Sequence, residues 1–161
     1  MKTKNIYIVE SDTPVNKTTA TQNFIDCGYM PFREKNVKLI NLSDTSHRKI
    51  WAREGLVGEG YLLSDTLFKI DVLVNVPALK THNLTAATMG FKNLFGLLSQ
   101  GNKAYFHKDI WDVIDRKKLL VNRKIDNVTL DLYNILKEKI KLTVIDGIVG
   151  SQGYCGVVFE N

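Results

Sequence analysis

Four polar residues in a row, at positions 80–83 (KTHN), stand between an apolar run and a segment with helical periodicity. The run before them, residues 71–76 (DVLVNV), has the composition of a strand buried on both faces of a parallel sheet, and Pro77 is expected to end its pairing. After them, apolar residues recur at helical spacing over 84–98. A polar turn between a buried strand and a helix is where open α/β sheets place ligands, and free helix N–H groups favour anions. The stretch therefore predicts a ligand site that prefers an anion.

Within this stretch, Lys80 and His82 are two residues apart and point to the same side if the backbone stays extended. A lysine holds phosphate or carboxylate as a point charge, and an imidazole exchanges a proton near neutral pH or binds a metal. Lys92, two helical turns along, is placed to reach back over the same site. The alternative is that Lys80 is a solvated loop lysine, His82 caps the helix and Lys92 is a surface charge.

Two further candidates lie later in the chain. His107 falls in residues 99–108 (SQGNKAYFHK), which we expect to form a loop. Asp146 follows a predicted buried strand at 142–145 (LTVI), and open sheets place functional carboxylates at the carboxyl ends of strands. If His107 folds close to His82, the two imidazoles and the Asp146 carboxylate would suit a divalent metal such as zinc. The alternatives are that His107 is a packed or surface residue and that Asp146 caps the glycine turn after it.

The sequence patterns of the segments around these residues predict an α/β domain. Strands are expected at 5–9, 37–42, 71–76 and 142–145, and helices at 15–27 (capped by Gly28), 84–98, part of 110–121, and from 126 or 127 to 140. Residues 43–70 indicate a hairpin-like or irregular segment. We therefore expect a mainly parallel sheet flanked by helices in a single domain over residues 1–161. Its glycine-rich tail leads into no further element, so we expect the domain to be incomplete at its C-terminus.

Composition limits the classes of function. The 161 residues are 44% hydrophobic and 24% charged, typical of one soluble globular domain. No apolar run approaches the roughly 18 residues of a membrane span, and the N-terminus lacks a signal-peptide core, so we expect a cytoplasmic protein without a membrane partner. The net charge of +5 allows an anionic partner, but the chain shows no nucleic-acid-binding motif. Its two cysteines, Cys27 and Cys155, are too few to ligate an iron–sulfur cluster by themselves.

Several segments resemble the family known as domain of unknown function 362: VNVPALKTHNLTAATMGFKNLFGLL, YFH at 105–107, LDL at 130–132 and LTVIDGIVGSQG. The resemblance implies an α/β fold and, because some members carry ferredoxin-like cysteine motifs, a link to iron–sulfur redox chemistry. This chain lacks those cysteines. The positions to which the resemblance points are Lys80, Thr81, His82, Lys92, Asn93, His107, Asp131, Asp146 and Gly147.

The leading hypothesis is an anion- or metal-dependent site at the carboxyl ends of the 71–76 and 142–145 strands, with a redox-related function. In this hypothesis the catalytic residues are His82, Lys80 and Asp146; the ligand-binding residues are Thr81, Lys92, Asn93 and Gly147; and the ligands of a divalent metal are His82, His107 and Asp146. The partner would be a small anion. One alternative is a non-catalytic module that docks onto an iron–sulfur or other redox protein, and another is a fragment without activity.

Overall fold

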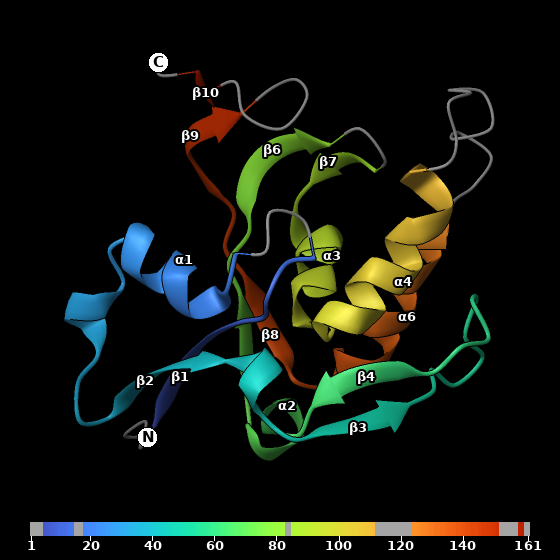
Figure 1. Ribbon diagram of the computed structural model, residues 1–161, viewed down its shortest axis with the longest axis horizontal. Helices are drawn as coiled ribbons and strands as arrows, with labels where there is room; N and C mark the ends of the chain where they lie inside the picture. The colour runs from blue at the N-terminus through green and yellow to red at the C-terminus, as the bar shows by residue number, and fades with distance from the viewer. Residues whose placement is uncertain (1–4, 15–17, 83–84, 112–123, 152–157, 160–161) are drawn as a thin grey trace.

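The computed structural model describes residues 5–14, 18–82, 85–111, 124–151 and 158–159 (Figure 1). The strands are β1 (Ile6–Glu10), β2 (Val37–Asn41), β3 (His47–Ile50), β4 (Tyr61–Ser64), β5 (Leu73–Asn75), β6 (Ala78–His82), β7 (Ala86–Thr88), β8 (Ile140–Thr143), β9 (Asp146–Ser151) and β10 (Val158–Phe159). The α-helices are α1 (Ala20–Asp26), α2 (Thr66–Lys69), α3 (Gly90–Asn93), α4 (Gln100–Trp111) and α6 (Lys124–Leu136), and 3₁₀ turns lie at Met30–Phe32, Leu42–Asp44 and Leu94–Leu97.

The strands form several small mixed sheets, so the prediction of a mainly parallel sheet is wrong. β1 pairs with β2 and β5 with β8 in parallel, whereas β3 and β4 form an antiparallel pair. In the largest sheet β6 lies between β9, its parallel neighbour, and β7, its antiparallel neighbour, and β10 pairs with the other side of β9. The error arose in residues 78–82, 86–88 and 146–151, where strand pairing forms instead of the expected polar turn, helix start and glycine-rich tail. Strand pairing overrides the local helical spacing of apolar residues there.

Pro77 lies between two pairs of parallel strands, and the regular pairing of the first pair ends before it, as predicted. The β5–β8 pair ends at Asn75, and the β6–β9 pair begins with Ala78 opposite Asp146. Between the two pairs, the Val144 N–H donates to the Asn75 carbonyl at 2.8 Å and the Asp146 N–H donates to the Pro77 carbonyl at 2.9 Å. The expected carboxyl ends of the two strands are therefore the middle of one longer parallel ribbon.

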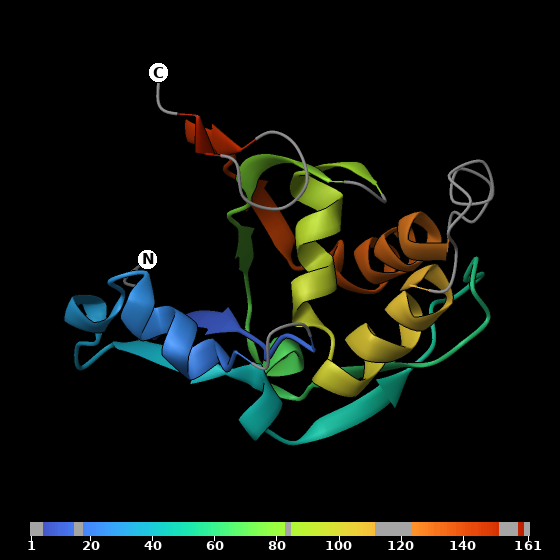
Figure 2. The ribbon, with the colours of Figure 1, turned by 45° about the horizontal axis from the view of Figure 1, so that its top comes forward.

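The β5–β8 pair is covered on one face only, which corrects the prediction that both strands are buried. Leu73 and Asn75 are buried, and the Asn75 amide donates to the Gly90 carbonyl of α3 at 2.8 Å. On the other face the cross-strand partners Val74 and Leu142 are 48% and 53% exposed. Helices α3, α4 and α6 gather to one side of this pair (Figure 2), and within the described part of the chain its second face is exposed.

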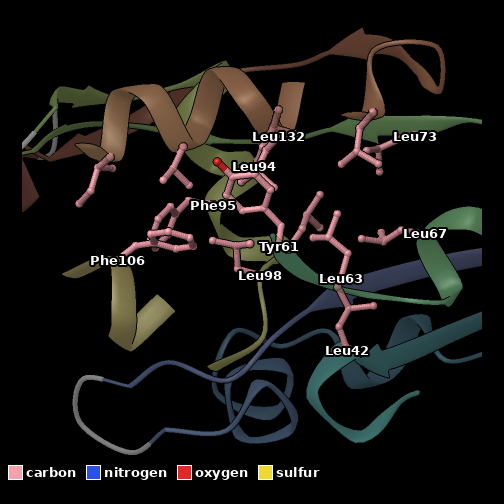
Figure 3. Packing of buried hydrophobic residues seen from close by; sticks show 14 residues of the cluster. Leu42, Tyr61, Leu63, Leu67, Leu73, Leu94, Phe95, Leu98, Phe106 and Leu132 are labelled. Atoms are coloured by element: carbon pink, nitrogen blue, oxygen red, sulfur yellow. The ribbon is translucent and has the colours of Figure 1, made fainter. Parts of the chain in front are cut away.

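The hydrophobic core lies between α6, the 94–98 segment, α4 and β4 (Figure 3). α6 contributes Val128, Leu132 and Leu136, which recur every fourth residue and form one buried stripe. The rings of Tyr61 on β4 and Phe106 on α4 pack 5.5 Å apart between their centroids. This core fixes the faces of α4 and of the 94–98 segment, and so the position of the basic residues that these elements carry.

Helix boundaries agree with the sequence in some places and differ in others. Gly28 has φ +72° directly after α1, as expected of a residue that ends a helix. The segment predicted as a loop at 99–108 lies mostly in α4, where Ser99 accepts a hydrogen bond from the Asn102 N–H. The helix predicted from residue 84 begins at Gly90 instead. Helices with the length and apolarity of a membrane span are absent from the described part of the chain.

Candidate functional site

Five basic residues from three elements lie within electrostatic reach of one another, and we call them the basic cluster. Its members are Lys80 and His82 on β6, Lys92 on α3, and Lys103 and His107 on α4. The positive charges of Lys92, His107 and Lys80 all act on His82, and those of Lys80 and Lys103 act on Lys92. The fold thus brings together positions that are up to 27 residues apart in the sequence.

Strand pairing places the β6 members of the cluster. Lys80 and His82 share one face of β6 because side chains alternate along a strand. Their cross-strand partners on β7 are Thr88 and Ala86, so Thr88 lies on the same face as Lys80. Since Lys92 and His107 act electrostatically on His82, this is the face of β6 turned towards α3 and α4.

Phe95 lies between the α3 and α4 members of the cluster. The Lys92 ammonium is 4.1 Å from the centroid of the Phe95 ring, a cation–π contact. The His107 ring also contacts Phe95, edge to face, with 4.8 Å between the ring centroids. α3 itself is held in place by an edge-to-face contact between Phe91 and Tyr133 of α6. The buried Phe95 ring therefore helps to position the side chains of Lys92 and His107.

Burial lowers the pKa of Lys92, His82 and His107, and neighbouring positive charges lower it further. The pKa of Lys92 falls from 10.5 to about 8, through desolvation first and then through Lys80 and Lys103, with Asp126 opposing the shift. The pKa of His82 falls from 6.5 to about 4, through desolvation and then the charges of Lys92, His107 and Lys80. The pKa of His107 is also lowered, mainly by burial. At neutral pH the charge of the cluster therefore resides on its lysines.

Lys103 is buried and serves the fold as well as the cluster. Its ammonium donates to the carbonyls of Ser11 at 3.1 Å and Asp12 at 3.2 Å, and lies 3.7 Å from the Glu10 carboxylate. Sequence reasoning placed this residue in a loop at 99–108 that could hold functional residues, but did not include it in the predicted site. The serine at position 99, a residue type that caps helices, was the signal for α4 and hence for a lysine on its inner face.

His107 has a defined tautomer. Its Nδ1 lies 2.8 Å from the Lys103 carbonyl oxygen, one turn back along α4. A carbonyl oxygen only accepts hydrogen bonds, so Nδ1 carries the proton of the neutral ring and Nε2 keeps its lone pair. The imidazole is thus oriented by its own helix.

Thr88 is a site residue that sequence reasoning missed. It is 8% exposed, yet its hydroxyl oxygen is buried without a hydrogen-bond partner among the residues that the structure describes. A buried hydroxyl without a partner costs free energy. The sequence signal was that Thr88 shares a polar stripe with Thr85 and Lys92, at helical spacing, in the helix predicted over 84–98.

The remaining predicted residues have structural contacts outside the cluster. The Asp146 carboxylate accepts from the Ile148 N–H at 3.2 Å, which is the predicted turn-capping alternative. Asn93 donates to the Asn75 side chain at 2.8 Å and ties α3 to β5. Thr81 is exposed on the opposite face of β6 from Lys80, and a Cβ at Gly147 would lie 3.7 Å from Leu79.

Asp131, to which the family resemblance pointed, is buried away from the basic cluster. It is 1% exposed and accepts hydrogen bonds from the N–H groups of Leu56 at 2.8 Å and Val57 at 3.2 Å, and from the Tyr61 hydroxyl at 2.6 Å. Burial and this carboxylate raise the pKa of Tyr61 far above its ordinary range. Asp131 therefore anchors the β3–β4 connection to α6.

A metal centre built from His82, His107 and Asp146 was the second chemistry that the sequence indicated. Within the described ranges, no three histidine, cysteine, aspartate or glutamate side chains lie close enough together to hold a metal ion. The residues that do converge are mainly cationic, and a protonated lysine has no lone pair with which to bind a metal. The arrangement is suited to attracting an anion.

Comparison with known proteins places the chain in a family. It is 30% identical over 91 residues to a thylakoid-associated protein of Synechocystis sp., an alignment that covers 56% of this chain and 25% of the relative. The chain thus spans about a quarter of the length of that curated relative. No solved structure matches it significantly. The family model described as domain of unknown function (DUF362) matches residues 1–157, and the chain therefore belongs to that family.

Proposed function

We propose that this chain binds an anionic ligand at the basic cluster. The observation that carries the proposal is Lys92, a partly buried ammonium that contacts the Phe95 ring but forms no ion pair with any described carboxylate. Removing an ammonium from water without an anionic partner costs several kcal/mol by order of magnitude. An anion bound at the cluster would offset that cost.

The charges around Lys92 support the same conclusion. Lys80 also lacks an ion pair within the described residues, whereas the Lys103 ammonium lies 3.7 Å from the Glu10 carboxylate and is also stabilised by the charge of Asp12. Asp126 is the one acidic group that raises the Lys92 pKa, and its effect is the smallest of the contributions. The balance of charge at the cluster is therefore positive, and a bound anion would be attracted by Lys80 and Lys92 together.

The proposal differs from the sequence prediction in how the anion is held. The prediction relied on free N–H groups at the start of a long helix, but α3 covers only Gly90–Asn93. A helix of one turn has little dipole to offer. Side-chain ammonium groups, rather than a helix terminus, supply the attraction.

Thermal unfolding in sodium phosphate, sulfate and acetate tests the proposal, with sodium chloride at equal ionic strength as the reference. We expect at least one of the three anions to raise the melting temperature of the wild type at pH 7 above its value in chloride. The Lys92→Met variant should lose this increase. Lys38→Met, which changes an exposed lysine on β2, is the matched control and should keep it.

Two outcomes would overturn the proposal. One is that none of the anions stabilises the wild type beyond chloride. The other is that Lys92→Met responds to the anions as strongly as the wild type does, because the ligand would then be bound elsewhere.

A further inference from the structure

The unpaired hydroxyl of Thr88 and the two unpaired lysines beside it define the ligand more narrowly. From this juxtaposition we infer that the anion is a phosphate group, held by the ammonium groups of Lys80 and Lys92 and by the Thr88 hydroxyl. The inference rests on the proposed function, because it names the class of anion bound at the same site.

The charge of the site favours a dianion. Lys80 and Lys92 are the cluster lysines without an ion pair to the described residues, whereas the Lys103 ammonium already lies near Glu10. His82 carries no charge at neutral pH, so it adds nothing to the count. Two unbalanced positive charges match a phosphate monoester or inorganic phosphate, whose charge at pH 7 is about −1.5 to −2. A single carboxylate would balance one of them.

The number of donors and the separate elements that carry them favour a phosphate as well. Lys80, Thr88 and Lys92 belong to β6, β7 and α3, three separate elements around one site. A phosphate group offers three strong acceptor oxygens in a tetrahedral arrangement, so that donors from different directions each find an oxygen. A carboxylate has two oxygens in one plane with its carbon, and fits a planar bidentate donor better than three separated ones.

Thr88 is the second, independent observation. Its side chain is more than nine-tenths buried, it shares the Lys80 face of the sheet, and its hydroxyl lacks an acceptor among the described residues. A valine would fill the same volume at this position without burying an unpaired hydroxyl. A threonine that costs stability in the free protein is accounted for if its hydroxyl donates to the bound phosphate.

Isothermal titration with inorganic phosphate, methyl phosphate and acetate at constant ionic strength and pH 7.5 tests the inference. We expect phosphate or methyl phosphate to bind the wild type at least about tenfold more tightly than acetate. Thr88→Val should weaken phosphate binding by about tenfold or more while leaving acetate binding unchanged, since a hydrogen bond to a charged group is lost. Thr88→Ser keeps the hydroxyl and should restore most of the affinity.

The outcomes separate this inference from the proposed function. If acetate binds as tightly as phosphate, or if Thr88→Val keeps full phosphate affinity, the phosphate inference is wrong while anion binding stands. If no anion binds at all, both fail. Tighter binding of inorganic phosphate than of methyl phosphate identifies a free phosphate ligand, and the reverse identifies a phosphate ester. Thermal unfolding serves as the control for the fold of Thr88→Val, and we expect this variant to melt at or above the temperature of the wild type.

Discussion

Replacing Lys92 by methionine should make the free protein more stable at pH 7. Methionine has a similar length and flexibility and is apolar, so it fills the place of the lysine stem beside Phe95 without bringing a charge into the fold. The wild-type cost can be worked out from the Lys92 pKa, which the fold lowers from 10.5 to about 8. A difference of that size corresponds to roughly 3 kcal/mol against the charged form.

The expected gain is smaller than that full value. The cation–π contact with Phe95 is lost in the variant, and such contacts contribute about 0.5–2 kcal/mol. We therefore expect Lys92→Met to raise the free energy of unfolding at pH 7 by about 1–3 kcal/mol. The same variant should lose stabilisation by anions, so that stability and binding change in opposite directions.

The pH dependence gives this prediction its sharpest test. Below pH 8, Lys92 is protonated in both the folded and the unfolded chain, and the full cost is present. Between about pH 8 and pH 10.5 the unfolded chain holds the proton more tightly, so the wild type gains stability as the pH rises. Lys80, Lys103 and Asp126 are the charged groups that act on Lys92.

Urea unfolding at pH 7 and at pH 10, with chloride as the only small anion, measures both effects. The advantage of Lys92→Met over the wild type should be largest at pH 7 and should shrink at pH 10. Lys38→Met serves as the control, since its exposed side chain should leave the unfolding free energy unchanged at both values. A Lys92→Met protein that is less stable than the wild type at pH 7, or an advantage that does not depend on pH, would refute the reasoning.

Three further predictions follow from other residues. The fold lowers the His82 pKa from 6.5 to about 4, through burial and then the positive charges of Lys92, His107 and Lys80. Between these two pH values the unfolded chain binds a proton that the folded chain does not, so wild-type stability should fall as the pH drops from 6.5 to 4. In a pH series of thermal melts, His82→Gln should remove most of this fall. Asp131→Asn should destabilise the fold by about 2–4 kcal/mol in urea, since an amide group would face donors that now bind a buried carboxylate, and a loss below 0.5 kcal/mol would contradict this role. Val74→Asp should change the unfolding free energy by less than about 1 kcal/mol, whereas the same change at its buried neighbour Leu73 should unfold the protein; equal effects at the two positions would show that the second face of β5 is covered.

The parts of the fold that the sequence predicted well are those in which local signals agree with distant pairing. β1 and β2 follow β-rich runs, and Gly28 ends α1 in the conformation that glycine favours. The antiparallel β3–β4 pair lies in the segment predicted as hairpin-like. In these places the local signals were enough to locate the elements, although the β1–β2 pair joins segments that are far apart in the sequence.

The failures concern residues whose structure depends on strand pairing and packing that the local spacing of apolar residues does not show. Residues 84–98 do show helical spacing, but β7 forms at 86–88 because β6 offers it an antiparallel edge. α4 was missed because few of its residues are apolar, and its burial rests on single side chains such as Phe106 and Lys103. Similarly, an apolar run predicts a strand but cannot show whether one face or both are covered. Val74 and Leu73 are both hydrophobic in the sequence, but their side chains lie on opposite faces of β5, and α3 covers only the face of Leu73.

The candidate site, too, was only partly predictable from the sequence. The sequence indicated Lys80, His82 and Lys92 as neighbours of an anion, and the structure brings these three together with Lys103 and His107 from α4. It did not indicate Thr88, because an unpaired buried hydroxyl exists only once β6 and β7 have paired. The attraction for an anion thus comes from charges that folding itself makes costly, as the lowered Lys92 pKa records. A ligand that neutralises them should therefore stabilise the fold more at pH 7 than at pH 10, where Lys92 has lost its proton and with it both the cost and the attraction.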